Sequence, residues 1–328
     1  MISALIAAGL LAATPAAASA PDCRFDGEPR AWTAEALASW DRLDRERLRI
    51  ARPVTPVITL FDAECAWTLT PDRRGDFRAG ARRYRTAGAA HDGQVGLPDG
   101  GLVPARRLAF ASPMSDGRIF FIMALPSLWR ADGGESRDPR RLSMVVFMHE
   151  FAHTQQAAGL GARIDGLLAR GLPEDTDDDV VQDRFGDRPG YRGAWEAERD
   201  LFYAAATAPD ATAVRAGLAQ ASRRMVERRS RWFTGDEAPY AEADDVFLTM
   251  EGTGNWAAWT WLADRRGGGL SPDDATAFVR GGGAHWSQDQ GLGMMLALDR
   301  LTPDWPTLAF SPGGVTADRL IERALGSR

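Results

Sequence analysis

The stretch that most constrains the fold is a long apolar run at residues 142–156, which carries ionisable groups inside it. It reads LSMVVFMHEFAHTQQ and contains His149, Glu150 and His153 in the pattern H-E-x-x-H. Histidines four residues apart on a helix lie one above the other, so both rings can reach one ion. A helix that is apolar nearly all round is buried, and buried imidazoles and carboxylates are costly unless paired or bound to metal. The stretch therefore predicts an interior metal site; two ordinary core histidines are the alternative.

The segment MHEFAHTQQ resembles the active-site helix of the zincin metallopeptidases. The resemblance implies a zinc ion (Zn2+) with His149 and His153 as ligands, Glu150 as general base, and hydrolysis of peptide bonds. No later segment reads H-x-x-G-x-x-H, so the third ligand is not the metzincin histidine. A glutamate on a later helix, the gluzincin arrangement, is the natural alternative. A non-catalytic zincin-fold binding module and a metallohydrolase of a non-peptide bond stay open, although the intact Glu150 argues against the former.

Two later helical segments carry glutamates that could be the third ligand. In residues 195–206, Glu198 shares the apolar face, while Glu196 and Asp200 match the E-x-x-x-D pattern of some gluzincins but lie on the polar side. A buried glutamate that does not bind the metal needs another partner. Five arginines between the two segments could provide one: Arg223, Arg224, Arg228, Arg229 and Arg231.

The second segment, residues 245–263, presents Glu251 on its inner face. The sequence EGTGNW from Glu251 resembles the E-G-x-x-x-aromatic signature at the ligand glutamate of many gluzincins. Gly252 and Gly254 cost helix propensity, but they let this helix approach the His149 helix closely. We predict Glu251 as the third ligand and Asn255 as a residue that orients a ligand histidine. Glu198 or Glu196 remains the alternative, because the long gap before Glu251 requires an inserted helical segment.

Gluzincins often place a histidine or tyrosine after the third ligand to stabilise the tetrahedral oxyanion. His285, the last histidine of the chain, lies late enough to be this catalytic residue. A structural or surface histidine is the alternative, and Tyr203 or Tyr240 could take the same role.

The expected fold is α+β and zincin-like, with a small mixed or antiparallel sheet plus the active-site helix, followed by a mostly helical C-terminal lobe. Residues 1–20 are expected to be a signal peptide, 21–160 an N-terminal α/β lobe that ends in the active-site helix, and 161–328 the helical lobe. Strands are predicted at 102–111 and 118–125. In the zincin resemblance, RIFFIMALPS takes the place of the edge strand that binds a substrate backbone; a plain core strand is the alternative. Helices are predicted at 33–50, capped by Thr33, and in the acidic stretch 174–187.

The first twenty residues read MISALIAAGLLAATPAAASA, an apolar run that ends in an A-x-A cleavage pattern. They predict an exported protein, periplasmic or extracellular, without stable membrane insertion once the signal is removed. A membrane anchor is the alternative, since no basic residue lies near the start. In an oxidising compartment, Cys23 and Cys65 are expected to form one disulfide, with two buried thiols as the alternative.

The composition is typical of a globular protein, with 45% apolar and 26% charged residues. The net charge of −6 gives no reason to expect a nucleic-acid partner. The expected partner is a peptide or protein substrate. Its sequence, the endo or exo mode of cleavage and the oligomeric state do not follow from the sequence.

Overall fold

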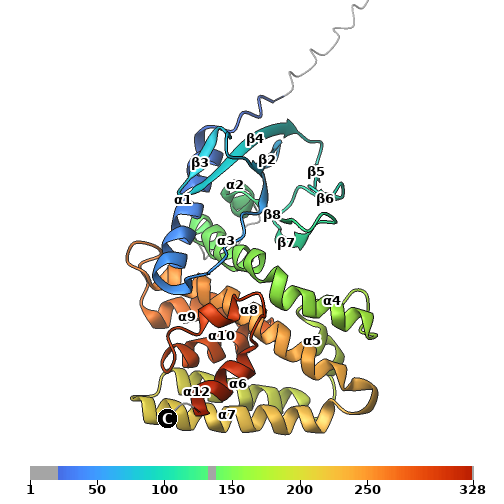
Figure 1. The fold of residues 1–328 in the computed structure, drawn as a ribbon, viewed down its shortest axis with the longest axis vertical. Helices are drawn as coiled ribbons and strands as arrows, with labels where there is room; N and C mark the ends of the chain where they lie inside the picture. Colours follow the sequence, from blue (N-terminus) through green and yellow to red (C-terminus); the bar gives the residue numbers. More distant parts are fainter. Residues whose placement is uncertain (1–20, 132–137, 327–328) are drawn as a thin grey trace, which may run out of the picture.

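The computed structural model describes residues 21–131 and 138–326 and combines a small mixed sheet with helices (Figure 1). The sequence therefore predicted the α and β content correctly. The strands of the described part lie between residues 57 and 124, and helices follow from residue 139. The predicted signal peptide, residues 1–20, lies outside the described residues.

The main sheet has the strand order β3-β4-β2-β1-β8-β7, in which β1 and β8 are parallel and the other neighbours antiparallel. The parallel strands β1 and β8 are buried on both faces and are almost continuously apolar, whereas β2 is buried on alternate residues. A short hairpin of β5 and β6 forms a second sheet. The strands are β1 (Val57–Phe61), β2 (Cys65–Pro71), β3 (Phe77–Ala79), β4 (Arg82–Ala90), β5 (Gln94–Gly96), β6 (Leu102–Pro104), β7 (Ala109–Pro113) and β8 (Ile119–Ala124).

The edge strand near the active-site helix is β7, not the RIFFIMALPS strand. β8 covers most of that stretch and lies between β1 and β7, with five of its six residues buried. Its apolar side chains alternate onto both covered faces, which is the pattern of an interior strand. The expectation of an edge strand there was wrong, and the predicted strand at 102–111 is divided between β6 and β7.

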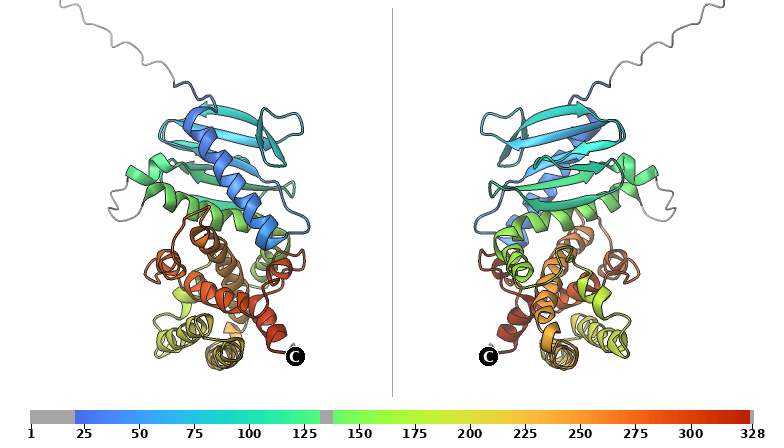
Figure 2. Two further views of the ribbon diagram at one scale, coloured as in Figure 1. Left: turned by 90° about the vertical axis from the view of Figure 1, so that its left-hand side faces the viewer. Right: turned by 90° about the vertical axis from the view of Figure 1, so that its right-hand side faces the viewer.

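Helices α1 (Gly27–Leu43) and α3 (Pro139–Gln156) pack on one face of the main sheet (Figure 2). Aromatic rings join the three layers in edge-to-face contacts: Phe121 of β8 lies against Phe147 and Phe151 of α3, which lie against Trp32 and Trp40 of α1. Helix α3, which carries His149 and His153, is thus held in the core by rings on two sides.

Helix α1 begins earlier than predicted, because Thr33 does not cap it. The helix starts at Gly27, and the Thr33 hydroxyl instead donates to the carbonyl of Pro29 one turn back. Glu28 and Pro29 in the first turn suit a helix start, since an acid favours the N-terminal dipole and proline has no N–H to leave unpaired. After Leu43 the helix continues as one π-turn, Asp44–Leu48.

The C-terminal half consists of helices, among which α8 (Pro239–Ala263) is central and contacts both α3 and α10 (Trp286–Asp299). The others are α4 (Ala162–Ala169), α5 (Val180–Phe185), α6 (Tyr191–Ala206), α7 (Ala211–Trp232), α9 (Pro272–Arg280), α11 (Pro306–Ala309) and α12 (Ala317–Gly326); a short α2 (Pro126–Ala131) precedes α3. In the acidic stretch 174–187, only α5 is helical. The Asp177 carboxylate accepts the N–H of Asp179 in a turn, which competes with the helix predicted there.

One hydrophobic cluster runs through both halves of the chain. It includes Trp40 and Phe151 from the sheet-bearing half and Trp256 and Leu298 from the helical half. The change near residue 160 is therefore a change of secondary structure within one continuous core.

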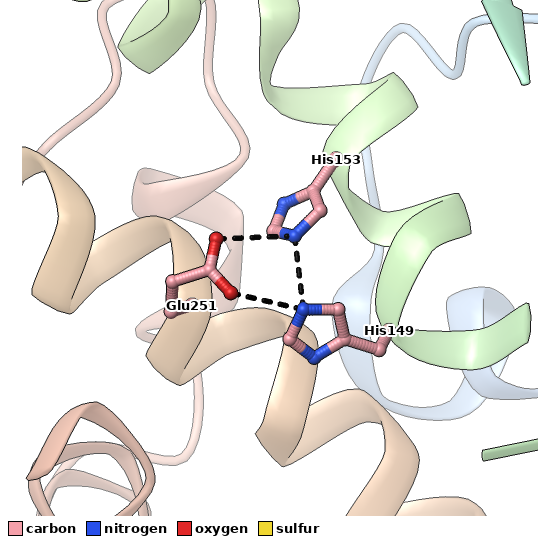
Figure 3. Close-up of side chains that lie close together, drawn as sticks. All are labelled: His149, His153 and Glu251. Carbon is pink, nitrogen blue, oxygen red and sulfur yellow. Dashed lines mark hydrogen bonds and ion pairs between the residues drawn. The ribbon is translucent and has the colours of Figure 1, made fainter. Parts of the chain in front are cut away.

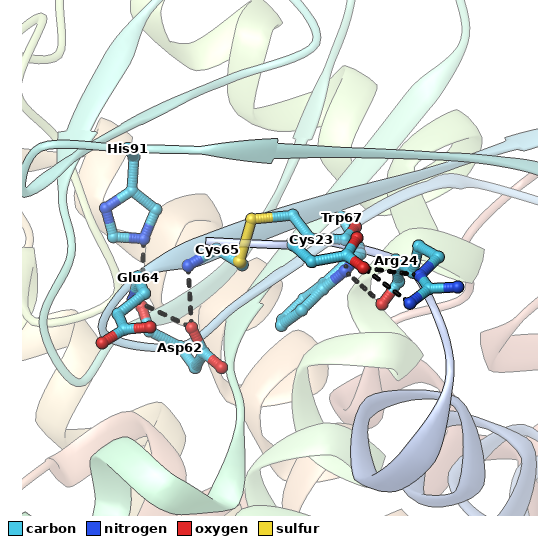
Figure 4. The surroundings of a disulfide bond; sticks show 8 residues. Cys23, Arg24, Asp62, Glu64, Cys65, Trp67 and His91 are labelled. Carbon is cyan, nitrogen blue, oxygen red and sulfur yellow. Dashed lines mark hydrogen bonds and ion pairs between the residues drawn. A yellow bond between two sulfur atoms is a disulfide. The ribbon is translucent and has the colours of Figure 1, made fainter. Parts of the chain in front are cut away.

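The predicted disulfide between Cys23 and Cys65 is present, with its Cα atoms 5.5 Å apart (Figure 4). It ties the beginning of the described chain to the first residue of β2. The indole N–H of Trp67 donates to the carbonyl of Cys23 over 2.9 Å and reinforces the link. Among the described residues, no helix is both long and apolar enough to cross a membrane.

Removing this disulfide should destabilise the protein. The bond spans 42 residues, and a loop of that length corresponds to about 4 kcal/mol of unfolded-state chain entropy. Urea unfolding of Cys23→Ala/Cys65→Ala should show a loss of that order, and intact-mass and free-thiol assays of the parent should show no free thiol. Two free thiols in the denatured, unreduced parent would contradict the assignment.

Candidate metal centre

Two histidines of α3 and a glutamate of α8, about a hundred residues later in the sequence, converge between the two helices (Figure 3). The Nε2 atoms of His149 and His153 lie 3.1 Å apart. The Glu251 carboxylate places one oxygen 3.0 Å from Nε2 of His149 and the other 3.3 Å from Nε2 of His153. These three residues form a group that could hold a metal ion.

Glycines on α8 permit this close approach on both of its sides. A Cβ atom on Gly254 would lie 2.9 Å from Nδ1 of His149, so a side chain there would push the imidazole away. A Cβ atom on Gly252 would lie 2.6 Å from the backbone of Gly291 in α10. The close approach expected from these glycines therefore holds, although only Gly254 faces α3.

Each histidine is oriented by an amide side chain on its other ring nitrogen. The Asn255 side-chain oxygen lies 2.8 Å from Nδ1 of His149, and the Asn255 NH₂ donates to the carbonyl of Gln288. The Gln156 side-chain oxygen lies 2.9 Å from Nδ1 of His153, and its NH₂ donates to the Thr253 hydroxyl. Because both amide oxygens accept, Nδ1 carries a proton in each ring, and Nε2 is the ring atom that each histidine turns toward Glu251.

The sequence predicted Asn255 in this position but not Gln156, Gln288 or Asp178. Gln156 lies one turn after His153 on the same helix, a spacing that could have indicated it. Gln288 donates to the Asp178 carboxylate over 3.3 Å and also lowers the pKa of Glu251 by a hydrogen bond. The sequence does not indicate Gln288 or Asp178 as neighbours of Glu251, because α10 and the segment before α5 reach α8 only in the folded chain.

The electrostatics of the group favour a bound cation. Burial opposes the charged form of His149, but the carboxylates of Glu251 and Glu150 and the Asn255 amide raise its pKa to about 9. Burial likewise opposes the charge on Glu251, yet the two histidines hold its pKa below the usual value. The electrostatics of the group thus favour positive charge, either a proton or a bound cation.

The donor set also suits zinc. Two imidazole nitrogens and one carboxylate oxygen form a usual protein zinc site that leaves one position open. Zinc–ligand bonds of 2.0–2.2 Å in a tetrahedron separate the donor atoms by roughly 3.3 to 3.6 Å. The separations here, 3.0 to 3.3 Å, are only slightly shorter.

Glu150 lies in the same electrostatic environment but binds none of these side chains. Burial raises the pKa of its carboxyl, while His149 and His153 pull it down. Within the described part of the chain the Glu150 carboxylate makes no hydrogen bond, so its oxygens are free to accept one.

The competing glutamates belong to other surroundings. Glu198 is completely buried and pairs with Arg228, whose Nε lies 2.8 Å from the carboxylate. Glu196 is partly exposed on the same helix and is not part of the group with the two histidines. The structure therefore brings Glu251, and neither of the other two, to His149 and His153.

Two of the five arginines form the partner cluster expected for a buried glutamate. Arg228 binds Glu198, Asp244 and the Tyr191 hydroxyl, and Arg229 binds Asp244 and Asp245. The other three are exposed on α7: Arg223, Arg224 and Arg231.

The residues considered for oxyanion stabilisation lie in other contacts. His285 is exposed just before α10, and its Nδ1 lies 2.9 Å from the Asp179 carboxylate. The Tyr203 hydroxyl donates to Asp289, and Tyr240 packs against Phe185. None of the three belongs to the group of donor atoms around Glu251.

A cleft of about 590 Å³ opens beside His153. One wall is the edge strand β7 with Ala111, Ser112 and Pro113, and the opposite wall is formed by residues 157–165 and by Met250. The cleft is largely apolar, and the candidate metal group lies at its side through His153.

No model of a known protein family matches the chain, and comparisons with curated proteins and with solved structures found no match either.

The glycine that faces His149 should be essential for the metal centre. Gly254→Ala gains about 1 kcal/mol of helix propensity, but its Cβ displaces the His149 ring. We therefore expect a 10- to 100-fold loss of zinc affinity, as when a residue that orients a metal ligand is removed. A chelator-competition assay measures it. Gly193→Ala in α6 is the matched control, because its Cβ would meet no atom within 4 Å. Equal zinc affinity of both variants would contradict the close approach of α8.

Proposed function

We propose that the protein is an exported, zinc-dependent peptidase of the gluzincin type, which hydrolyses peptide bonds in the cleft beside His153. One observation carries the proposal. A buried glutamate from a helix about a hundred residues later places its two oxygens 3.0 and 3.3 Å from the Nε2 atoms of the H-E-x-x-H histidines.

In this proposal His149, His153 and Glu251 hold the zinc ion. When bound, zinc acts as a Lewis acid and makes water a nucleophile near neutral pH. Asn255 and Gln156 accept the Nδ1 protons of the two ligand imidazoles, which orients both rings and leaves Nε2 for the ion. The packing of α3 between the sheet and α8 keeps the three ligands in place without substrate.

Glu150 is the proposed general base. It follows a ligand histidine directly, its carboxylate accepts no hydrogen bond from the described residues, and burial raises its pKa. A carboxylate with a raised pKa is a better base near neutral pH, because its basicity is closer to the operating pH. It takes the proton of the attacking water and delivers it to the leaving amine. The role of His285 in binding the oxyanion stays a prediction, which would require its ring to leave Asp179.

The open edge of β7 supports a peptide as the substrate. Met114 donates to Arg118 and Leu108 accepts from Ala124, so the even-numbered residues of β7 bond to β8. In an antiparallel pair, the residues between them point their N–H and C=O groups outward. Ala109 and Ala111 therefore offer a donor and an acceptor at the sheet edge, where an extended peptide can add as a further strand. The metal ligands and Glu150 would also suit hydrolysis of another kind of bond. Pairing with the backbone of β7 favours a peptide substrate.

Export is supported by the disulfide, since such bonds persist in oxidising compartments. The mature chain is then expected to begin at Pro21, after the A-x-A pattern.

The first test separates metal binding from catalysis. Glu150→Gln should keep zinc, because the three ligands remain, but should lose at least about a hundredfold in turnover of a peptide library, the usual contribution of a general base. Metal analysis and mass-spectrometric detection of cleaved peptides measure the two effects. Wild-type turnover in this variant would exclude the mechanism, and a zinc-loaded parent that cleaves no peptide would exclude the function.

The second test compares two buried glutamates. Glu251→Ala should purify without zinc, since it removes one of three ligands. Glu198→Ala should keep zinc and instead lose stability, by up to about 3–5 kcal/mol, because the buried Arg228 then keeps only Asp244 as a carboxylate partner and shares it with Arg229. Metal content and urea unfolding of both variants give the comparison. A zinc-containing Glu251→Ala protein would show that the metal is held elsewhere.

A further inference from the structure

A second hollow lies at the same end of the sheet as the cleft, where β2, β3 and β4 meet the C-terminal end of α1. Its volume is about 790 Å³. Five arginines line it: Arg45, Arg73, Arg78, Arg82 and Arg83. This concentration of positive charge is notable in a chain whose net charge is −6.

Among the described residues, four of the five arginines form no ion pair. Three carboxylates also line the hollow, but Asp41 pairs with Arg82, Asp72 pairs with Arg85, and Asp44 accepts the N–H of Ile50. Within the described part of the chain no ion pair involves the remaining four, Arg45, Arg73, Arg78 and Arg83. All four are exposed, and the only hydrogen bonds of their guanidinium groups go to backbone carbonyls of Gly80 and Gly75.

The arginine hollow and the cleft share a wall. Thr55 lines both, with Pro53 on the side of the hollow and Val54 on the side of the cleft. Helix α3 holds this segment in place, because the Gln155 side chain accepts the N–H of Val54 over 2.7 Å and donates to its carbonyl over 3.1 Å. The wall is therefore fixed relative to His153, two residues before Gln155.

The sheet register explains why the two hollows are neighbours. The end of β2 pairs with the start of β4 at Pro71 and Tyr84, and the end of β7 pairs with the start of β8 at Pro113 and Ile119. β1 begins between them, directly after Thr55 and Pro56. One end of the sheet thus runs from the arginine hollow past Thr55 to the cleft.

From this continuity we infer that the arginine hollow binds an acidic stretch of the substrate whose other part occupies the cleft. The inference rests on the proposed function. Guanidinium groups bind carboxylates in pairs of charge-assisted hydrogen bonds. An acidic peptide is repelled by the overall negative protein, so a local cluster of unpaired arginines is needed to hold it. The protein therefore prefers peptides with acidic residues several positions from the cleaved bond.

The experiment measures binding without hydrolysis, in zinc-loaded Glu150→Gln. The probes are fluorescein-labelled peptides of eight alanine and leucine residues, extended at either end by four glutamates or by four glutamines. Fluorescence anisotropy at low salt should show the glutamate peptide binding at least about tenfold more tightly, the effect expected of a few charge-assisted hydrogen bonds. The difference should shrink at high salt, because exposed charges are screened.

Adding Arg73→Gln/Arg83→Gln should remove this difference, while Arg73→Lys/Arg83→Lys should keep part of it. The matched control is Arg223→Gln/Arg231→Gln, which removes two exposed arginines from α7 at the other end of the molecule (Figure 1). The inference is overturned if the first double variant still prefers glutamate as its parent does, or if the control loses the preference equally. It is also overturned if tetraglutamate alone binds as tightly as the extended peptide, since the cleft would then contribute nothing. Because no step requires cleavage, a failure of the proposed peptidase activity would appear separately, in the library digest.

Discussion

The structure depends on holding Glu251 in the interior against two imidazoles. A buried carboxylate is costly unless an opposite charge or hydrogen bonds compensate it. Here His149 and His153 lower the pKa of Glu251. The side-chain oxygens of Asn255 and Gln156 accept hydrogen bonds from the Nδ1 atoms of the two rings. Each polar atom of the group has a partner, and the partners come from α3, α8 and the start of α10. The charge balance therefore requires these three helices to be in register.

The packing that achieves this register uses glycine on α8 and aromatic rings on α3. Gly252 and Gly254 are in positions where a single Cβ would collide with α10 or with His149. On the other side of α3, Phe147 and Phe151 lock the helix against Phe121 and the tryptophans of α1. The histidine face is thus free to meet α8 because the opposite face is filled by rings.

In the proposed function the sheet carries the substrate side of the molecule. Among the described residues, no strand pairs with the outer edge of β7, and Ala111 and Pro113 at the end of that strand line the cleft. The segment at Thr55 then connects the cleft to the arginine hollow. The proposed substrate contacts and the candidate metal ligands therefore lie on different layers, and Gln155 on α3 bonds to the segment at Val54 that borders the cleft.

The sequence by itself determined the local features. The spacing of His149 and His153 follows from the helix period, the pair of cysteines indicated the disulfide, and Glu251 was distinguished by the glycines around it. It did not determine that β8 is interior, that α1 begins at Gly27, or that the acids before α5 form turns. Strand order and helix ends depend on the elements that pack against each segment. The hydrophobic pattern of a sequence indicates that a residue is buried, but not which neighbour buries it. Glu198 and Glu251 are both buried, and only the tertiary structure assigned Arg228 to one and the histidines to the other, because that choice is made by which helices meet.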